Sequence, residues 1–267
     1  MKLREAERLL REAGIEDARD EARIIFRELG GLSPMELISL DAVAEVDDAV
    51  ARRAKREPLA YITGRAYFYR EEYGVDENCL IPRSDTEILV DFAVKNLTRG
   101  GHFIDICTGS GCIALSVLNN TESTTATAVD ISAGAVAMAR KNADALGLSD
   151  RIDLLVRDAL TSAVVGEYDA VLSNPPYVTD GEYLALEKEL YFEPRAAFVG
   201  GADGGDFYRR LTPLYKTLLK PCGFIAYEIG AAQANLLREI AEENGMSCEI
   251  LRDLGGRDRV AVLRAKN

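Results

Sequence analysis

Strand-like and helical segments alternate along this chain from about residue 84 to residue 245. Residues 103–106 are apolar and strand-like, small residues follow at 107–111, and a helical pattern begins directly after them. Further strand patterns follow at 125–130 and 152–156. Parallel strands need a long crossover between them, usually a helix, so this alternation predicts an α/β fold with a doubly wound, mainly parallel sheet.

Small residues and carboxylates follow the ends of these three strands. Glycines permit a sharp turn and close approach of a ligand to the backbone, and the helix start beyond offers free N–H groups. A carboxylate at Asp130 can accept hydrogen bonds from both hydroxyls of a ribose. Open α/β sheets bind ligands at this edge, which predicts a nucleoside site, for NAD or another adenosine ligand. Its candidate residues are Cys107, Thr108, Gly109, Ser110, Gly111, Asp130, Asp158 and Ala159.

The sequence SNPPY at 173–177 follows a fourth apolar strand pattern at 168–172. Two consecutive prolines end a strand and stiffen the backbone, because neither ring donates a hydrogen bond and each fixes φ. The Asn174 amide oxygen and the Pro175 carbonyl then provide two acceptors at a fixed spacing for an NH2 group, while Pro176 keeps the turn rigid and Tyr177 can stack on a planar group. The stretch alone is also compatible with an ordinary turn. With the nucleoside site, it favours a holder for an amide or aromatic amine over a nicotinamide enzyme.

The order of DICTGSG, AVD, RDA and SNPPY is similar to class I S-adenosylmethionine methyltransferases that modify exocyclic or amide nitrogens. YITG at 61–64, IPRSDTE at 81–87, FEP at 192–194 and GGADG at 200–204 make the match closer. With them the chain resembles, over nearly its whole length, the HemK/PrmC family of peptide chain release factor glutamine methyltransferases. Two positions depart from the family pattern: Cys107 stands where glycine is common, and Ala159 where a larger side chain would stack on adenine.

This resemblance implies a Rossmann-like, seven-stranded class I methyltransferase sheet whose last strand is antiparallel. It also implies a small N-terminal helical domain joined to the sheet by a β-hairpin. We therefore expect a helical bundle that binds the release factor at 1–58, a hairpin linker at 59–81, and the methyltransferase domain at 82–267. Helical spacing of apolar residues across 2–57 agrees with the first of these.

The implied activity is methyl transfer from S-adenosyl-L-methionine to a glutamine side-chain nitrogen, in the Gly-Gly-Gln loop of bacterial class I release factors. Thr108 to Gly111 are expected beside the methionine moiety, Asp130 at the ribose hydroxyls, and Asp158 at the adenine amino group. Cys107 and Ala159 are further candidates for cofactor binding. Asn174 is expected to contact both cofactor and substrate. The other expected substrate contacts are Pro175, Pro176, Tyr177 and Arg83, although Arg83 alternatively pairs with a surface acid.

Local patterns lead to four smaller expectations. The sequences at 33–36 and 84–87 have the form of capping boxes, the second opening a helix to about Leu97. Glu187 and Glu189 are expected on a solvated helix face, while Glu193 and Arg195 are expected to order the loop after SNPPY.

The composition of the chain argues against several classes of function. The net charge is −12, divided as −3 over residues 1–75 and −9 over the remainder, which argues against stable binding to a nucleic-acid backbone. No apolar run is long enough to span a bilayer, and the N-terminus lacks the apolar core of a signal peptide, so a cytoplasmic location is expected. One histidine and five cysteines without a Cys-x-x-Cys pair predict no metal site and reduced thiols.

Other activities share these motifs. A ribosomal-protein glutamine methyltransferase would carry the same sequence signature. A DNA or RNA adenine methyltransferase also uses NPPY, although it would be expected to carry a basic groove. A non-catalytic binding module on the same fold would tolerate damage to the motifs, and both the loop and SNPPY are intact.

Overall fold

The computed structural model describes residues 1–97, 100–161 and 164–266 of the 267-residue chain. It divides into two compact units. The helical unit consists of Met1–Arg65 and Glu187–Phe192, and the sheet unit consists of Ala66–Leu186 and Glu193–Asn267.

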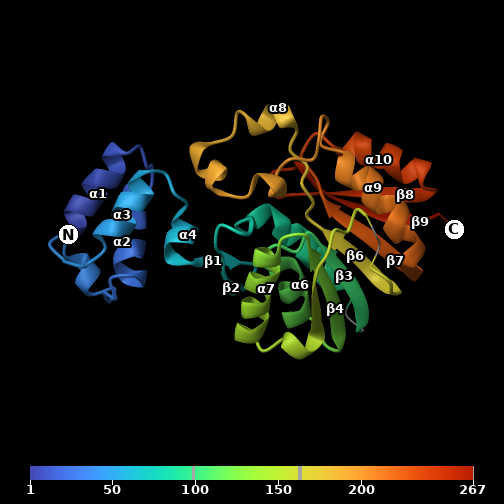
Figure 1. The fold of residues 1–267 in the computed structure, drawn as a ribbon, viewed down its shortest axis with the longest axis horizontal. Coiled ribbons are helices and arrows are strands. Elements are labelled where there is room, and N and C mark those ends of the chain that lie inside the picture. Colours follow the sequence, from blue (N-terminus) through green and yellow to red (C-terminus); the bar gives the residue numbers. More distant parts are fainter. Residues whose placement is uncertain (98–99, 162–163, 267) are drawn as a thin grey trace. The chain divides into compact units, whose positions relative to one another are not determined.

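The helical unit is a small bundle around an apolar core, and its part Met1–Arg65 is drawn in blue to cyan in Figure 1. Its core includes Leu3, Leu10, Ile25, Phe26 and Val50, which are fully buried. The capping box at Ser33–Glu36 forms as expected: the Ser33 backbone N–H and hydroxyl both donate to the Glu36 carboxylate, and Glu36 N–H donates back to Ser33 Oγ. The helical elements are α1 (Leu3–Glu12), α2 (Ala18–Glu28), η1 (Glu36–Ile38), α3 (Asp47–Ala54), α4 (Leu59–Thr63) and η4 (Lys188–Phe192).

Residues 187–192 belong to the helical unit, although they follow SNPPY and were expected within the domain 82–267. Ion pairs explain the assignment. Glu189 accepts hydrogen bonds from Arg53 at 3.2 Å and from Arg56 at 2.8 Å, and Arg53 also binds Glu21. The expectation of a solvated acid at Glu189 is therefore wrong, because two guanidinium groups of the bundle bind its carboxylate.

The segment expected as a hairpin linker begins with a helix. Pro58 precedes α4, and the hairpin itself is β1 (Arg65–Phe68) and β2 (Glu71–Gly74). Side chains of β2 bind the helix α6 (Cys112–Asn119) and its C-cap: the Tyr73 hydroxyl lies 2.6 Å from Ser116 Oγ, and Glu71 accepts from Ser116, Asn119 and Asn120. These contacts place most of the hairpin in the sheet unit.

The large sheet of the sheet unit has seven strands in the order β5-β4-β3-β6-β7-β9-β8. All neighbouring pairs are parallel except those that involve β9, which runs antiparallel to both β7 and β8. This topology agrees with the expected sheet, including the reversed last strand. The strands are β3 (Gly101–Ile106), β4 (Thr124–Asp130), β5 (Ile152–Val156), β6 (Tyr168–Ser173), β7 (Leu219–Glu228), β8 (Met246–Arg252) and β9 (Asp258–Ala265).

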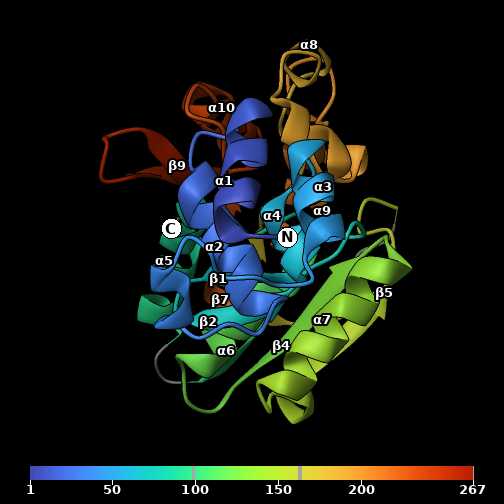
Figure 2. The same ribbon diagram turned by 90° about the vertical axis from the view of Figure 1, so that its left-hand side faces the viewer.

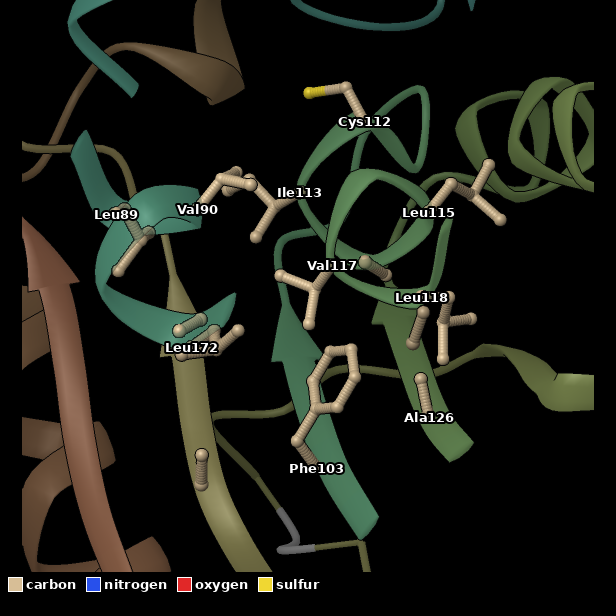
Figure 3. Close-up of a cluster of buried hydrophobic side chains, with 14 of the residues drawn as sticks. Leu89, Val90, Phe103, Cys112, Ile113, Leu115, Val117, Leu118, Ala126 and Leu172 are labelled. Carbon is tan, nitrogen blue, oxygen red and sulfur yellow. The ribbon is translucent and has the colours of Figure 1, made fainter. Parts of the chain in front are cut away.

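Helices cover both faces of the sheet, because successive strand residues point to opposite sides. Phe103 on β3 packs with α5 (Glu87–Asn96) and α6 (Cys112–Asn119), and Figure 3 shows Phe103 below Val117 of α6. The next residue, Ile104, packs in the opposite core with α9 (Asp206–Tyr215) and α10 (Ala234–Glu243). The helix α7 (Ala133–Ala145) lies along β4 and β5 (Figure 2).

Short helices complete the sheet unit: η2 (Ser84–Thr86), η3 (Ser149–Arg151), α8 (Asp180–Tyr183), η5 (Arg195–Ala197) and η6 (Lys216–Leu218). The predicted capping box at Ser84–Glu87 does not form, since no side chain caps η2 or α5. Glu87 instead accepts a hydrogen bond from the Tyr69 N–H, 2.8 Å away. Among the described residues, no helix has the length and apolar character needed to cross a membrane.

Candidate active site

A cavity of about 300 Å³ opens at the carboxyl ends of the parallel strands. Residues that follow β3, β4, β5 and β6 line it, as expected for the ligand edge of a doubly wound sheet. Ten of the predicted site residues line the cavity: Arg83, Cys107, Thr108, Gly109, Ser110, Asp130, Asp158, Ala159, Asn174 and Pro176. The other three, Gly111, Pro175 and Tyr177, are not among the lining residues.

The loop after β3 takes its shape from two backbone positions and a buried carboxylate. Cys107 has a φ of 62°, a conformation that favours glycine, which explains why glycine is common there in the family that the chain resembles. Gly111 has a φ of 82°, and a Cβ there would lie 3.1 Å from the Ala139 side chain. Asp105, at the end of β3, accepts from the Thr108 hydroxyl at 2.6 Å and from Ala114 N–H at 3.3 Å. The buried Asp105 carboxylate thus holds the loop in shape in the absence of a ligand.

Asp105 is fully buried, and its Oδ1 has no hydrogen-bond partner among the described residues. Burial raises the pKa of Asp105 to about 7, although the Thr108 and Ala114 hydrogen bonds oppose the shift. The carboxyl does not line the cavity. Its place is therefore structural support of the loop rather than contact with a ligand.

Asp130 ends β4 with its carboxylate at the cavity. Its two oxygens each accept one backbone hydrogen bond of 2.9 Å, from Gly109 N–H and from Ser132 N–H. Burial raises the pKa of this group, against the effect of those hydrogen bonds. A carboxylate oxygen can accept more than one hydrogen bond, so each retains a free lone pair toward the cavity.

Asp158 and Ala159 lie beyond β5 on the same side. Asp158 Oδ1 accepts from Leu160 N–H at 2.9 Å, which closes a local turn and leaves Oδ2 available. Ala159 is buried in the cavity wall, together with the apolar side chains of Val129 and Leu160. This part of the cavity therefore combines an apolar wall with one carboxylate oxygen.

SNPPY leaves β6 with Asn174 half-buried at the cavity. The Asn174 Nδ2 group donates to Thr86 Oγ1 over 3.3 Å. Tyr177 is oriented differently from expectation: its hydroxyl donates to Glu228 Oε1 at 3.2 Å, and its ring packs in the core below α9 and α10. The stacking role predicted for Tyr177 is thus not visible in its position, because the buried Glu228 carboxylate binds its hydroxyl.

Arg83 was expected either to contact the substrate or to pair with a surface acid. It pairs with an acid, but that acid is buried. Glu193, only 3% exposed, binds Arg83 through Oε1 and the Ile81 N–H through Oε2 at 2.9 Å. Glu193 therefore orders the segment before α5, while Arg195 pairs with Asp180 on the surface. Both pairs agree with the ordering role expected for these two residues.

His102, the one histidine, lies near the start of β3, where its ring stacks on Tyr168 with centroids 5.2 Å apart. Its position at the opposite end of the strand from the cavity indicates a structural role. Within the ranges that the structure describes, no cluster of three His, Cys, Asp or Glu side chains is arranged to hold a metal ion.

Family comparisons match both parts of the chain. The PrmC N-terminal domain matches residues 2–64, and the Methyltransferase small domain matches residues 84–196. A release factor glutamine methyltransferase from Rhodospirillum rubrum is 39% identical, with 96% of this chain and 82% of the relative covered. The protein of the same name from Clostridium acetobutylicum is 38% identical, with coverages of 84% and 81%.

The chain belongs to the release factor glutamine methyltransferase family. The resemblance seen in the motifs is thereby confirmed. A solved methyltransferase from Pyrococcus furiosus has a TM-score of 0.54 at 18% identity, with 72% of this chain and 86% of that chain covered, which shows that the fold is shared. The expected class I methyltransferase fold is confirmed as well.

For a member of the release factor glutamine methyltransferase family, the structure adds side chains that the motifs did not indicate as site residues. Thr86 and Glu228 lie directly behind Asn174 and Tyr177, and Asp105 lies beneath the loop. Thr86 falls inside IPRSDTE, so the motif contained it without showing its partner. Glu228 ends β7 and carried no signal beyond an acid at a strand end, the same signal that indicated Asp130.

Proposed function

We propose that this protein transfers a methyl group from S-adenosyl-L-methionine to the side-chain amide nitrogen of a glutamine in a protein. The substrate we propose is the Gly-Gly-Gln glutamine of a class I peptide chain release factor, as the names of its relatives suggest. The main support from the structure is the position of Asn174. Its side chain lies in the cavity that the strand-end carboxylates also line, with Nδ2 already bound to Thr86.

The cavity has the donors and acceptors that an adenosyl group requires. Asp130 has a free lone pair on each oxygen for the two ribose hydroxyls, and Asp158 Oδ2 can accept from an adenine amino group. The apolar wall at Val129, Ala159 and Leu160 offers a surface for the adenine ring. The loop 107–111 would hold the methionine end. When bound, S-adenosyl-L-methionine supplies a methyl group on a positively charged sulfur.

The acceptors of SNPPY address the difficulty of the reaction. A carboxamide nitrogen shares its lone pair with the carbonyl and is therefore a poor nucleophile. We assign the Asn174 side-chain oxygen and the Pro175 carbonyl to the two N–H groups of the substrate amide. Held in this way, the nitrogen is drawn toward tetrahedral geometry and its lone pair is aimed, which is catalysis by orientation and by removal of water.

A side-chain base is not required by this assignment. A carboxamide nitrogen that has gained a methyl group is strongly acidic, so its extra proton can pass to water. Pro176 lines the cavity and keeps the turn rigid, while Tyr177 secures the end of the motif through Glu228. We place Arg83 at the rim on the substrate side, where Glu193 fixes its guanidinium.

We assign binding of the release factor's body to the helical domain at 1–58. The match of residues 2–64 to the PrmC N-terminal domain supports this assignment. The acidic balance of the chain supports a protein substrate over a nucleic acid, since grip on a phosphate backbone depends on cationic side chains. Because release factors act during translation, we propose a cytoplasmic site of action.

A labelling experiment tests the function. The protein is incubated with methyl-labelled S-adenosyl-L-methionine and, separately, with a class I release factor, ribosomal proteins, or DNA and RNA. Label on the release factor, mapped by mass spectrometry to the Gly-Gly-Gln glutamine and absent when that glutamine is changed to alanine, is the expected result. Label on a ribosomal protein or on adenine instead would replace this proposal with the corresponding alternative.

A further inference from the structure

Two buried side chains lie behind Asn174: Thr86, which is also part of the cavity wall, and Glu228, which does not line the cavity. Thr86 accepts a hydrogen bond from Asn174 Nδ2 over 3.3 Å, and its own hydroxyl donates to Glu228 Oε2 over 2.5 Å. Thr86 and Glu228 are each only 2% exposed. The register of the sheet explains the proximity: Ser173 of β6 pairs with Tyr227 of β7, so Asn174, directly after β6, lies beside Glu228, the last residue of β7.

The chemistry of a hydroxyl group gives this chain of hydrogen bonds a direction. A threonine hydroxyl has one proton, and an ionised carboxylate, which Glu228 is above its pKa of about 7, can only accept. When Thr86 gives its proton to Glu228, it can only accept from Asn174, and the group that donates must be the Asn174 NH2. The Asn174 oxygen therefore cannot face Thr86 and is directed away from it.

Glu228 also holds the other end of the motif. Its second oxygen, Oε1, accepts from the Tyr177 hydroxyl at 3.2 Å. One carboxylate thus binds Tyr177 directly and Asn174 through Thr86, so both ends of SNPPY are fixed by the same buried group. Neither Thr86 Oγ1 nor the Glu228 carboxylate is needed for contact with a substrate in this arrangement.

We propose that Thr86 and Glu228 are positioning residues that select one of the two orientations of the Asn174 amide, the one that presents its oxygen to the cavity. An amide reversed by half a turn would present NH2 to the substrate NH2 and could not accept from it. The consequence for turnover rests on the proposed function, because it assumes that the Asn174 oxygen accepts from the substrate amide. The orientation itself is a property of the protein alone.

The test compares Thr86→Val, which removes the hydroxyl at nearly constant volume, with Thr86→Ser, which retains it. Glu228→Gln no longer fixes the direction of the hydrogen bonds from Asn174 through Thr86 to residue 228, since a carboxamide can donate as well as accept. Thr121→Val serves as the matched control: it removes another buried threonine hydroxyl, one that bonds the Val117 carbonyl and does not line the cavity.

The first measurement needs neither cofactor nor substrate. The side-chain NH2 signals of Asn174, assigned by their loss in Asn174→Asp, are followed by NMR with ¹⁵N labelling. We expect shifted signals and faster proton exchange with solvent in Thr86→Val, wild-type behaviour in Thr86→Ser and Thr121→Val, and an intermediate state in Glu228→Gln. Unchanged Asn174 signals in a folded Thr86→Val protein would overturn the proposal.

The second measurement uses release factor turnover. Thr86→Val should lower kcat by about 10- to 100-fold while KM for the release factor and the binding of S-adenosyl-L-methionine change less than about threefold, the pattern of a lost transition-state contact. Thr86→Ser should recover most of kcat. If the wild-type protein fails to methylate glutamine while the Asn174 signals still respond to Thr86, the proposed function is wrong and the positioning role remains. If kcat survives Thr86→Val, the positioning role is wrong and the function remains.

Discussion

The two sides of the cavity are built in different ways. On the side of β3, β4 and β5, the groups that face the cavity are fixed by neighbours that are close in sequence, such as Ser132 with Asp130 and Leu160 with Asp158. On the side of β6 and β7, they are fixed by distant side chains: Thr86 binds Asn174 across 88 positions and Glu228 across 142. The first side therefore follows from local sequence, whereas the second exists only once the sheet has formed.

The largest effect on activity is expected at Asn174, on the side of β6 and β7, where distant side chains fix the groups (the long-range side). Asn174→Ala removes the acceptor that we assign to the substrate amide and should lower turnover about 100- to 1000-fold, the range seen for loss of one oriented catalytic hydrogen-bonding group. Binding of S-adenosyl-L-methionine, measured by calorimetry, should stay within a few-fold. Asn235→Ala, at an exposed asparagine of α10, is the control. Near-normal turnover in Asn174→Ala would exclude the assigned role.

On the side of β3, β4 and β5, where sequence neighbours fix the groups (the short-range side), substitutions should change the affinity for S-adenosyl-L-methionine instead of turnover. Asp130→Ala removes the acceptor proposed for the ribose and also the anchor of Gly109, so the Kd for S-adenosyl-L-methionine should rise about 30- to 100-fold, or about 2–3 kcal/mol. Asp153→Ala changes an exposed acid of the neighbouring strand and should leave the Kd unaltered. Equal affinities for both variants would mean that Asp130 does not bind the ligand.

Buried carboxyl groups offer a test of stability on the long-range side. Burial raises the pKa of Glu228 to about 7, from an ordinary value near 4.5, although hydrogen bonds from Thr86 and Tyr177 oppose the shift. Asp85 raises it further and Arg259 lowers it, while the Tyr208 hydroxyl binds the Glu228 backbone carbonyl. Between these two pH values the folded protein retains a proton that the unfolded chain has released.

The contribution of Glu228 to the free energy of unfolding should therefore fall as pH rises from about 4.5 to about 7, by about 3 kcal/mol in all. Glu228→Gln should remove this part of the pH dependence, so that the variant gains stability relative to wild type as pH increases. Denaturant unfolding at pH 5 and pH 8 measures the difference. Asp105 has a similarly raised pKa and remains in the variant, so part of the pH dependence should persist. If the difference in free energy of unfolding between wild type and Glu228→Gln did not change with pH, Glu228 would not have the raised pKa.

The smallest effect is expected on the short-range side, at Cys107. Glycine would relieve a left-handed conformation that costs other residues about 1–2 kcal/mol, but it would also add about 0.5–1 kcal/mol of backbone entropy to the unfolded state. Cys107→Gly should thus change the free energy of unfolding by less than about 1 kcal/mol and preserve cofactor binding. Cys107→Val, with a branched side chain at the same φ, should destabilise by more. Thermal unfolding compares the two, and a strongly destabilised glycine variant would show that the thiol's packing matters more than the backbone.

The sequence predicted the fold and the cavity to the extent that their signals were local. Strand ends at Ile106, Asp130 and Val156 follow from apolar periodicity, and the glycine-like φ at Cys107 fits a turn of small residues. The hydrogen bonds of Glu228 could not be predicted, because they depend on the register between β6 and β7.

Two other expectations from the sequence were wrong for the same reason, namely partners that are distant in the sequence. Glu189 looked like a surface acid because its partners, Arg53 and Arg56, lie more than 130 positions away. The capping box at Ser84–Glu87 had the correct pattern, but longer-range partners engage Thr86 and Glu87 instead. Local pattern therefore identifies the residues available at a site, and tertiary structure decides which partner each one takes.

The ion pairs of Glu189 make the helical unit something other than a detachable N-terminal extension. The backbone passes between the two units at three points, near residues 65, 186 and 192, because a segment from the middle of the chain returns to the bundle. A protein shortened to residues 66–267 would keep Glu189 and lose both guanidinium groups that neutralise it. An exchange of the helical unit, by evolution or by engineering, must therefore replace two separate stretches of the gene together.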